Sequence, residues 1–68
     1  MRVKNEKNRV LLMKGKSIFA KTEWFPPDGL DEGGIIIDAV DYPLDDLSVL
    51  EDFLESSLWL VRERRMKR

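Results

Sequence analysis

The sequence predicts a small α+β domain in which a three-stranded antiparallel sheet carries one C-terminal α-helix packed on one face. Two apolar runs separated by Gly15-Lys16 indicate a β-hairpin, and the β-branched run at residues 35–40 indicates a third strand. Leucines at helical spacing over residues 47–61 indicate the helix. A chain of 68 residues is one small domain, so we expect residues 1–7 to form a flexible basic arm and residues 8–68 to form a single ββ-β-α unit.

The hairpin has glycine first in a two-residue loop, which favours a type II′ turn. A regular ladder from that turn pairs Met13 with Ile18, Leu12 with Phe19 and Leu11 with Ala20. Cross-strand partners point to the same face. The face expected to point inward then carries Leu11, Met13, Ile18, Ala20 and Trp24. The face expected to point outward carries Val10, Leu12, Phe19 and Phe25 among Lys14, Lys21 and Glu23.

The third strand follows a turn of Pro, Asp and Gly residues, since Pro26 and Pro27 cannot donate hydrogen bonds to a ladder. Its alternation places Ile35, Ile37 and Ala39 inward, and Ile36 and Val40 outward. The helix is expected to begin between Pro43 and Val49 and to end near Met66. The side expected to pack on the sheet is formed by Leu47, Leu50, Phe53, Leu54, Leu58 and Val61.

The composition argues against catalysis and against cofactors. The chain has no cysteine and no histidine, which removes disulfides, thiolate zinc sites and the commonest general base. One sheet and one helix offer little means of separating the pKa values of a carboxylate pair such as Asp45 and Asp46. The acids of the Pro-Gly loop lack the spacing of a calcium loop. We therefore expect no enzyme activity, no cofactor and no metal.

The localisation expected is cytoplasmic, with no membrane contact, because the first residues are polar and no apolar run approaches membrane-spanning length.

The charges are sorted along the chain although the net charge is −1. Residues 22–61 contain eleven acids and no Lys or Arg, between two basic ends. The helix dipole explains acids at the start of the helix and cations at its end. It does not explain the whole run of acids from the loop to the helix start: Asp28, Asp31, Glu32, Asp38, Asp41, Asp45 and Asp46. Such a surface would attract a basic protein and could imitate nucleic acid, which predicts a non-catalytic regulator or inhibitor.

Apolar residues outside the expected core are the second candidate contact set. Trp59 falls opposite the apolar side of the helix, where it is either covered by the N-terminal arm or left to anchor a partner. The outward sheet face would be too apolar to remain in water, which predicts a homodimer or a docked partner. The anchors are Trp59, Val10, Leu12, Phe19, Phe25, Ile36 and Val40.

Two other functions fit the sequence. The basic arm and the C-terminal cluster could grip a nucleic-acid backbone, although they have no interleaved aromatics and no known motif. The residues of this cluster are Arg62, Arg64, Arg65, Lys67 and Arg68. The chain could also be a small structural subunit of a larger assembly, in which case the acids serve solubility.

Overall fold

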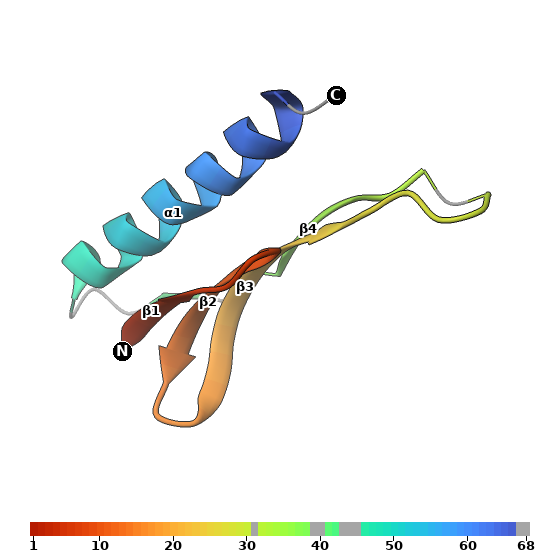
Figure 1. Ribbon diagram of the computed structural model, residues 1–68. Coiled ribbons are helices and arrows are strands. Elements are labelled where there is room, and N and C mark those ends of the chain that lie inside the picture. Colours follow the sequence, from red (N-terminus) through yellow and green to blue (C-terminus); the bar gives the residue numbers. More distant parts are fainter. Residues whose placement is uncertain (31, 39–40, 43–45, 67–68) are drawn as a thin grey trace.

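The computed structural model describes residues 1–30, 32–38, 41–42 and 46–66. Four strands form one antiparallel sheet in the order β1-β2-β3-β4, which is a meander, and one helix lies across a face of it (Figure 1). The strands are β1 (Arg2–Asn5), β2 (Arg9–Lys14), β3 (Ser17–Phe25) and β4 (Gly34–Asp38), and the helix is α1 (Leu47–Met66). The α+β class and the C-terminal helix are confirmed, whereas the expected three strands are four.

The additional strand comes from the segment expected to be a flexible arm. β1 pairs antiparallel with β2, with Val3 opposite Leu12 and Asn5 opposite Val10. A tight turn joins the two strands, in which the backbone N–H of Glu6 donates to the carbonyl of Arg9 at 2.8 Å. The alternation of Val3 with polar neighbours is too short to predict a strand by itself, so pairing with β2 decides the structure of this segment.

The β2–β3 hairpin has the expected turn but a different register. Lys14 lies opposite Ser17, and Gly15 has a φ of 62°, as the first position of a type II′ turn requires. Met13 pairs with Ile18 as expected, but Leu12 pairs with Ala20 because Phe19 is an extra, bulged residue. A one-residue shift moves every later side chain to the other face. The expected pairing of Leu11 with Ala20 is therefore wrong.

The bulge reverses the expected faces of β2. The core on the helix side consists of Val10, Leu12, Ala20, Phe53 and Leu60, and Phe19 packs against it. Leu11 and Met13 alternate with these residues and are buried on the opposite face. Ile18, also expected to point inward, is exposed.

β4 ends at Asp38, and the remainder of the expected third strand, Ala39 and Val40, lies outside the described residues. Its ladder places Trp24 opposite Ile35 and Thr22 opposite Ile37. Because Thr22 faces the helix, both isoleucines share the helix-side face, as expected. Ile35 is half-buried there, but Ile37 is 68% exposed. Gly33 precedes β4 where a Cβ atom would lie 2.5 Å from the carbonyl oxygen of Phe25, so only glycine fits this loop.

α1 begins within the expected range and ends at Met66, as expected. Asp46 is its N-cap, since the Asp46 carboxylate accepts hydrogen bonds from the Ser48 hydroxyl at 2.7 Å and from the Val49 N–H at 3.4 Å. These bonds, led by that of Ser48, lower the pKa of Asp46. The Tyr42 hydroxyl donates to the Asp46 carbonyl at 2.7 Å and its ring meets Phe19 edge-on, which joins the helix start to the bulge.

The helix packs on the sheet through only part of the side expected. Of the six residues expected there, Phe53 is in the core and Leu50 packs against it, whereas the other four are exposed. Phe53 and Leu60 are buried, and Ser56 and Ser57 lie between them along the same side. At the centre of the contact the hydroxyl of Thr22, which is 1% exposed, donates to Ser57 Oγ at 2.9 Å. Small side chains bring the helix close to the sheet, and this hydrogen bond satisfies the polar groups that the approach buries.

Candidate interaction surfaces

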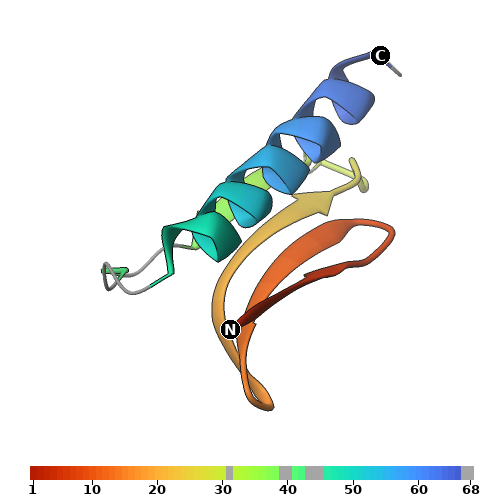
Figure 2. The same ribbon diagram turned by 90° about the vertical axis from the view of Figure 1, so that its left-hand side faces the viewer.

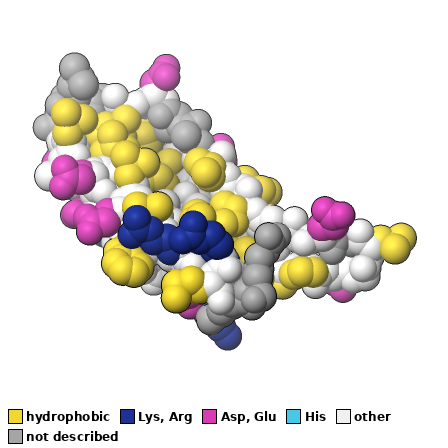
Figure 3. Space-filling model, turned by 90° about the horizontal axis from the view of Figure 1, so that it is seen from above, with side chains coloured by type: hydrophobic (Ala, Val, Ile, Leu, Met, Phe, Trp, Pro, Cys, Tyr) yellow, Lys and Arg dark blue, Asp and Glu magenta, His cyan; other side chains and the backbone are white. Residues whose placement is uncertain are grey.

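Because α1 packs on the sheet through Phe53 and Leu60, an apolar stripe on a neighbouring side of the helix is left in solvent. Leu47, Leu54, Leu58 and Val61 are between 37% and 57% exposed, although the sequence predicted that they would pack on the sheet. Half-buried Leu50 continues the stripe toward the core. We call these five residues the helix stripe. Figure 3 looks down on the helix side of the molecule and shows hydrophobic side chains gathered in a patch, with acidic and basic groups at its borders.

At the end of α1, the stripe lies near the strands that the helix covers least, because Val61 lines a hollow with Trp24 of β3 and Ile35 of β4. α1 packs mainly on β2 and β1, and the diagonal course of the helix over the curved sheet is visible in Figure 2. A shallow hollow of about 500 Å³ runs along the stripe, and Glu51 and Glu55 line it together with the leucines. An apolar surface of this extent with an acidic border is typical of a protein-binding site.

β4 adds a second apolar surface at the edge of the sheet. It lies at the end of the strand order, so one side of its backbone has no neighbouring strand among the described residues. Ile36 is 48% exposed on the face away from the helix, and Ile37 is exposed on the helix side. Ile36 was expected to be an outward anchor, and the structure places it on that face.

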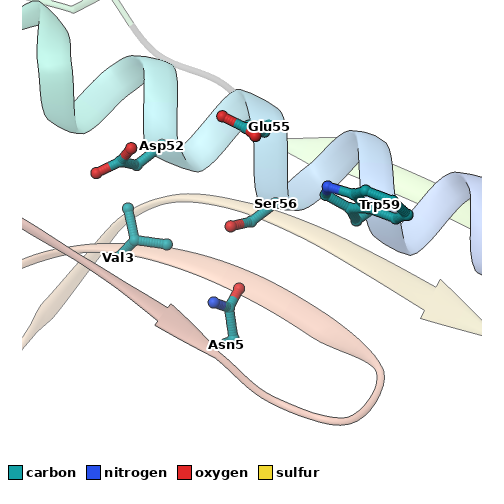
Figure 4. Close-up of a pocket in the computed structure, with 6 residues that line it drawn as sticks. All are labelled: Val3, Asn5, Asp52, Glu55, Ser56 and Trp59. Atoms are coloured by element: carbon teal, nitrogen blue, oxygen red, sulfur yellow. The ribbon is translucent and has the colours of Figure 1, made fainter.

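Trp59 lies on the other side of the helix, above β1. It is 62% exposed, so the N-terminal segment does not cover it. Trp59 forms the end of an open notch of about 360 Å³ between α1 and β1, whose other lining residues are Val3, Asn5, Asp52, Glu55 and Ser56 (Figure 4). The guanidinium of Arg62 stands 5.8 Å from the centre of the indole ring, which shows that this ring accepts a cation.

The other expected anchors have different positions. Val10 and Leu12 are core residues and are not accessible to a partner, and Phe19 is half-buried against the core. Phe25 is 38% exposed at the end of β3. Val40 lies outside the described residues.

The expected acidic surface is divided between the two ends of the molecule. Asp28 and Glu32 lie in the loop between β3 and β4, and Glu32 lines the same hollow as Arg64 and Arg65 at the end of the helix. Asp46 caps the opposite end of the helix, which is about 30 Å long by its 20 residues. Asp38 is the exposed last residue of β4 and Asp41 is exposed shortly after it, whereas Asp31 and Asp45 lie outside the described residues.

Within the C-terminal basic cluster, Arg64 serves the fold. Its guanidinium donates to the Lys7 carbonyl at 2.9 Å and to Asn8 Oδ1 at 2.7 Å, and it stands 4.2 Å from the centre of the Trp24 ring. These contacts fasten the end of α1 to the β1–β2 turn and to β3. Of the remaining basic residues, Arg62 lies over Trp59, Arg65 is exposed, and Lys67 and Arg68 lie outside the described residues.

A further hollow is formed where the end of the helix meets the β3–β4 loop. It measures about 690 Å³, and its walls include Trp24, Phe25, Ile35 and Val61, with Glu32 and Arg65 at the rim. An apolar floor with charges of both signs at its rim suits contact with a polypeptide. Val61 also belongs to the helix stripe, so this hollow continues the same apolar surface.

Sequence reasoning missed the helix stripe because it assigned the leucines to the core. One signal was present: Thr22, Ser56 and Ser57 are small polar residues, which allow close packing when they hydrogen-bond to each other.

Comparisons with protein-family models, with curated proteins and with solved structures found no match to this chain. Within the described part of the chain, no helix is long and apolar enough to cross a membrane. In the same part, no group of three or more Asp and Glu residues is arranged to hold a metal ion.

Proposed function

We propose that this chain is a non-catalytic regulator or inhibitor that works by docking on another protein in the cytoplasm. The observation that carries the proposal is the helix stripe, which shares Val61 with the hollow at the end of the helix. A helix that faces solvent with leucines is unfavourable in a free monomer, and a docked partner removes these leucines from water.

The energetic gain from the stripe limits the kind of partner. Completing the burial of one half-exposed leucine or valine contributes about 1 kcal/mol, which is half of the value for a full side chain. Leu47, Leu54, Leu58 and Val61 together give about 4 kcal/mol, which lies at the lower limit of the cost of association. The stripe therefore needs further contacts, and the acids beside it are suited to provide them.

The charges beside the stripe favour a basic partner. Glu51 and Glu55 border its first half, and Glu55 also lines the Trp59 notch with Asp52. Lysine or arginine side chains of a partner could pair with these carboxylates beside the Trp59 ring, which stays 62% exposed although Arg62 lies over it. This acidic border differs from the one predicted: it consists of helix residues, whereas Glu32 of the β3–β4 loop lines the same hollow as Arg64 and Arg65.

Nucleic-acid binding is the weaker candidate because Arg64 is committed to internal contacts and Arg62 lies over Trp59. Without those two groups, the described C-terminal cluster retains only Arg65 as an uncommitted cation in this structure. A role as a structural subunit would use the same helix stripe and differs from regulation only in how permanent the complex is.

The test compares three baits on the host lysate: the wild-type chain, a Leu54→Lys/Leu58→Lys variant and a Trp59→Ala variant. The double variant should lose the captured partner and should also stop binding a dye for exposed hydrophobic surface. Trp59→Ala should weaken capture while the circular dichroism spectrum remains unchanged. Capture of the same proteins by all three baits would refute the proposed surface.

A further inference from the structure

We infer that β4 is the site at which two copies of this chain join, through an antiparallel β4–β4 pair about a two-fold axis centred on Ile36. The inference extends the proposed function by naming a second copy of the chain as one partner. It starts from the two edges of the sheet, because an edge strand leaves backbone N–H and C=O groups available to another chain.

The two edges of the sheet differ in how they are protected. β1 carries Arg2 and Lys4, both exposed, and charged residues of this kind prevent the addition of a further strand. β4 consists of a glycine, three isoleucines and a single acid, Asp38. Of the two edges, β4 is therefore the one open to pairing.

The order of residues in β4 suits self-pairing. A two-fold axis at Ile36 places Ile36 opposite its own copy, Ile35 opposite Ile37 of the second copy, and Gly34 opposite Asp38. Every isoleucine then meets an isoleucine, and the two carboxylates are kept at opposite ends of the pair. The same operation on β1 would bring two arginines and two lysines together on the joining edge.

The joined sheet covers the side chains that are exposed in one copy. Ile36 meets its copy on the face away from the helix, and Ile37, which is 68% exposed, meets Ile35 of the second copy on the helix side. Two four-stranded sheets become one continuous eight-stranded sheet, with both helices on the same face. A contact of five residues per copy is smaller than a stable interface, which has about 20–30 residues a side, so the dimer is expected to be weak and to dissociate on dilution.

Sedimentation over a dilution series tests the inference with two matched variants. Ile36→Lys removes the central contact, whereas Ile18→Lys makes the same change at a residue of nearly equal exposure, 49% against 48%, near the hairpin turn. We expect the wild-type chain and the Ile18→Lys variant to dimerise alike, and the Ile36→Lys variant to remain monomeric at every concentration. A wild-type chain that is monomeric throughout, or an Ile36→Lys variant that dimerises normally, would overturn the inference.

Oxidation of single-cysteine variants tests the register without relying on Ile36→Lys. The chain has no cysteine of its own. Residues directly opposite in an antiparallel pair have Cα atoms about 4.5–5.5 Å apart, within reach of a disulfide, whereas residue 37 and its copy are two positions out of register and too distant. Ile36→Cys should form a covalent dimer and Ile37→Cys should not, although residue 37 is more exposed. Equal cross-linking of the two variants would contradict the two-fold axis at Ile36.

The Leu54→Lys/Leu58→Lys variant separates this inference from the proposed function. It should keep the dimer and lose the external partner. If this variant becomes monomeric while Ile36→Lys stays dimeric, the copies join through the helix stripe and the β4 inference is wrong.

Discussion

The hydrogen bond between Thr22 and Ser57 gives the sharpest test of how the helix sits on the sheet. Thr22 is 1% exposed, and its hydroxyl donates to Ser57 Oγ at 2.9 Å across the helix–sheet contact. Thr22→Val keeps the shape of the side chain and leaves the Ser57 hydroxyl without its donor. An unsatisfied buried hydroxyl costs about 1–3 kcal/mol. Because Ser57 is only partly buried, we expect about 1–2 kcal/mol, by the same principle.

The assay is thermal unfolding followed by circular dichroism, on Thr22→Val, Ser57→Ala and the double variant. For a domain of this size, 1 kcal/mol corresponds to a change in Tm of about 4–8 °C. Removing both hydroxyls leaves no unpaired group, so the double variant should be more stable than the sum of the single losses indicates. Strictly additive losses would show that the two hydroxyls do not interact, and the side of α1 described as facing the sheet would then be wrong.

Three further predictions follow from the contacts of the fold. Arg64→Met removes two hydrogen bonds and the contact with Trp24. It should lower the free energy of unfolding by about 1–2 kcal/mol, since partial exposure reduces the usual contribution of hydrogen bonds from a charged donor. An unchanged urea midpoint would show that Arg64 does not hold the end of the helix to the sheet. Leu12→Ala should cost about 2–5 kcal/mol and Leu58→Ala about 0.5 kcal/mol, and similar losses for the two would contradict the assignment of core and stripe. Because the pKa of Asp46 is lowered in the folded chain, the stabilisation that this carboxylate provides is present above the ordinary pKa of 3.8 and is lost as the pH falls through the lower folded-state pKa. The difference in Tm between the wild-type chain and Asp46→Ala should therefore shrink on acidification. A difference that is independent of pH would refute the N-cap.

The elements of the fold were largely predictable because each has a local signal. Gly15 marks the hairpin turn, and leucine spacing marks a helix that ends at Met66. β1 was missed because four residues with one apolar side chain carry no periodicity. The strand exists through its pairing with β2, which no local pattern reports.

The candidate surfaces were harder to predict because they depend on which side of each element is buried. α1 has two apolar sides. The more continuous side, with Leu54 and Leu58, is exposed, and the side on which Ser57 pairs with Thr22 is buried against the sheet. The acids expected to form one surface are divided for a different reason: β4 runs between Glu32, which lies near the end of α1, and Asp46, which caps its start. Among the expected anchors that the structure describes, Trp59, Ile36 and Phe25 are exposed, whereas Val10 and Leu12 are in the core.

The bulge at Phe19 determines where the gap falls when this chain is aligned with a relative that is one residue shorter in the hairpin. Because Met13–Ile18 and Leu12–Ala20 are paired on either side of the bulge, deletion of Phe19 would leave a regular hairpin in which all other residues keep their faces. A relative one residue shorter at this point would therefore keep Val10, Leu12 and Ala20 in its core and lack only the ring that meets Tyr42. In an alignment of such chains, the single-residue gap belongs at position 19 and not in the turn at Gly15.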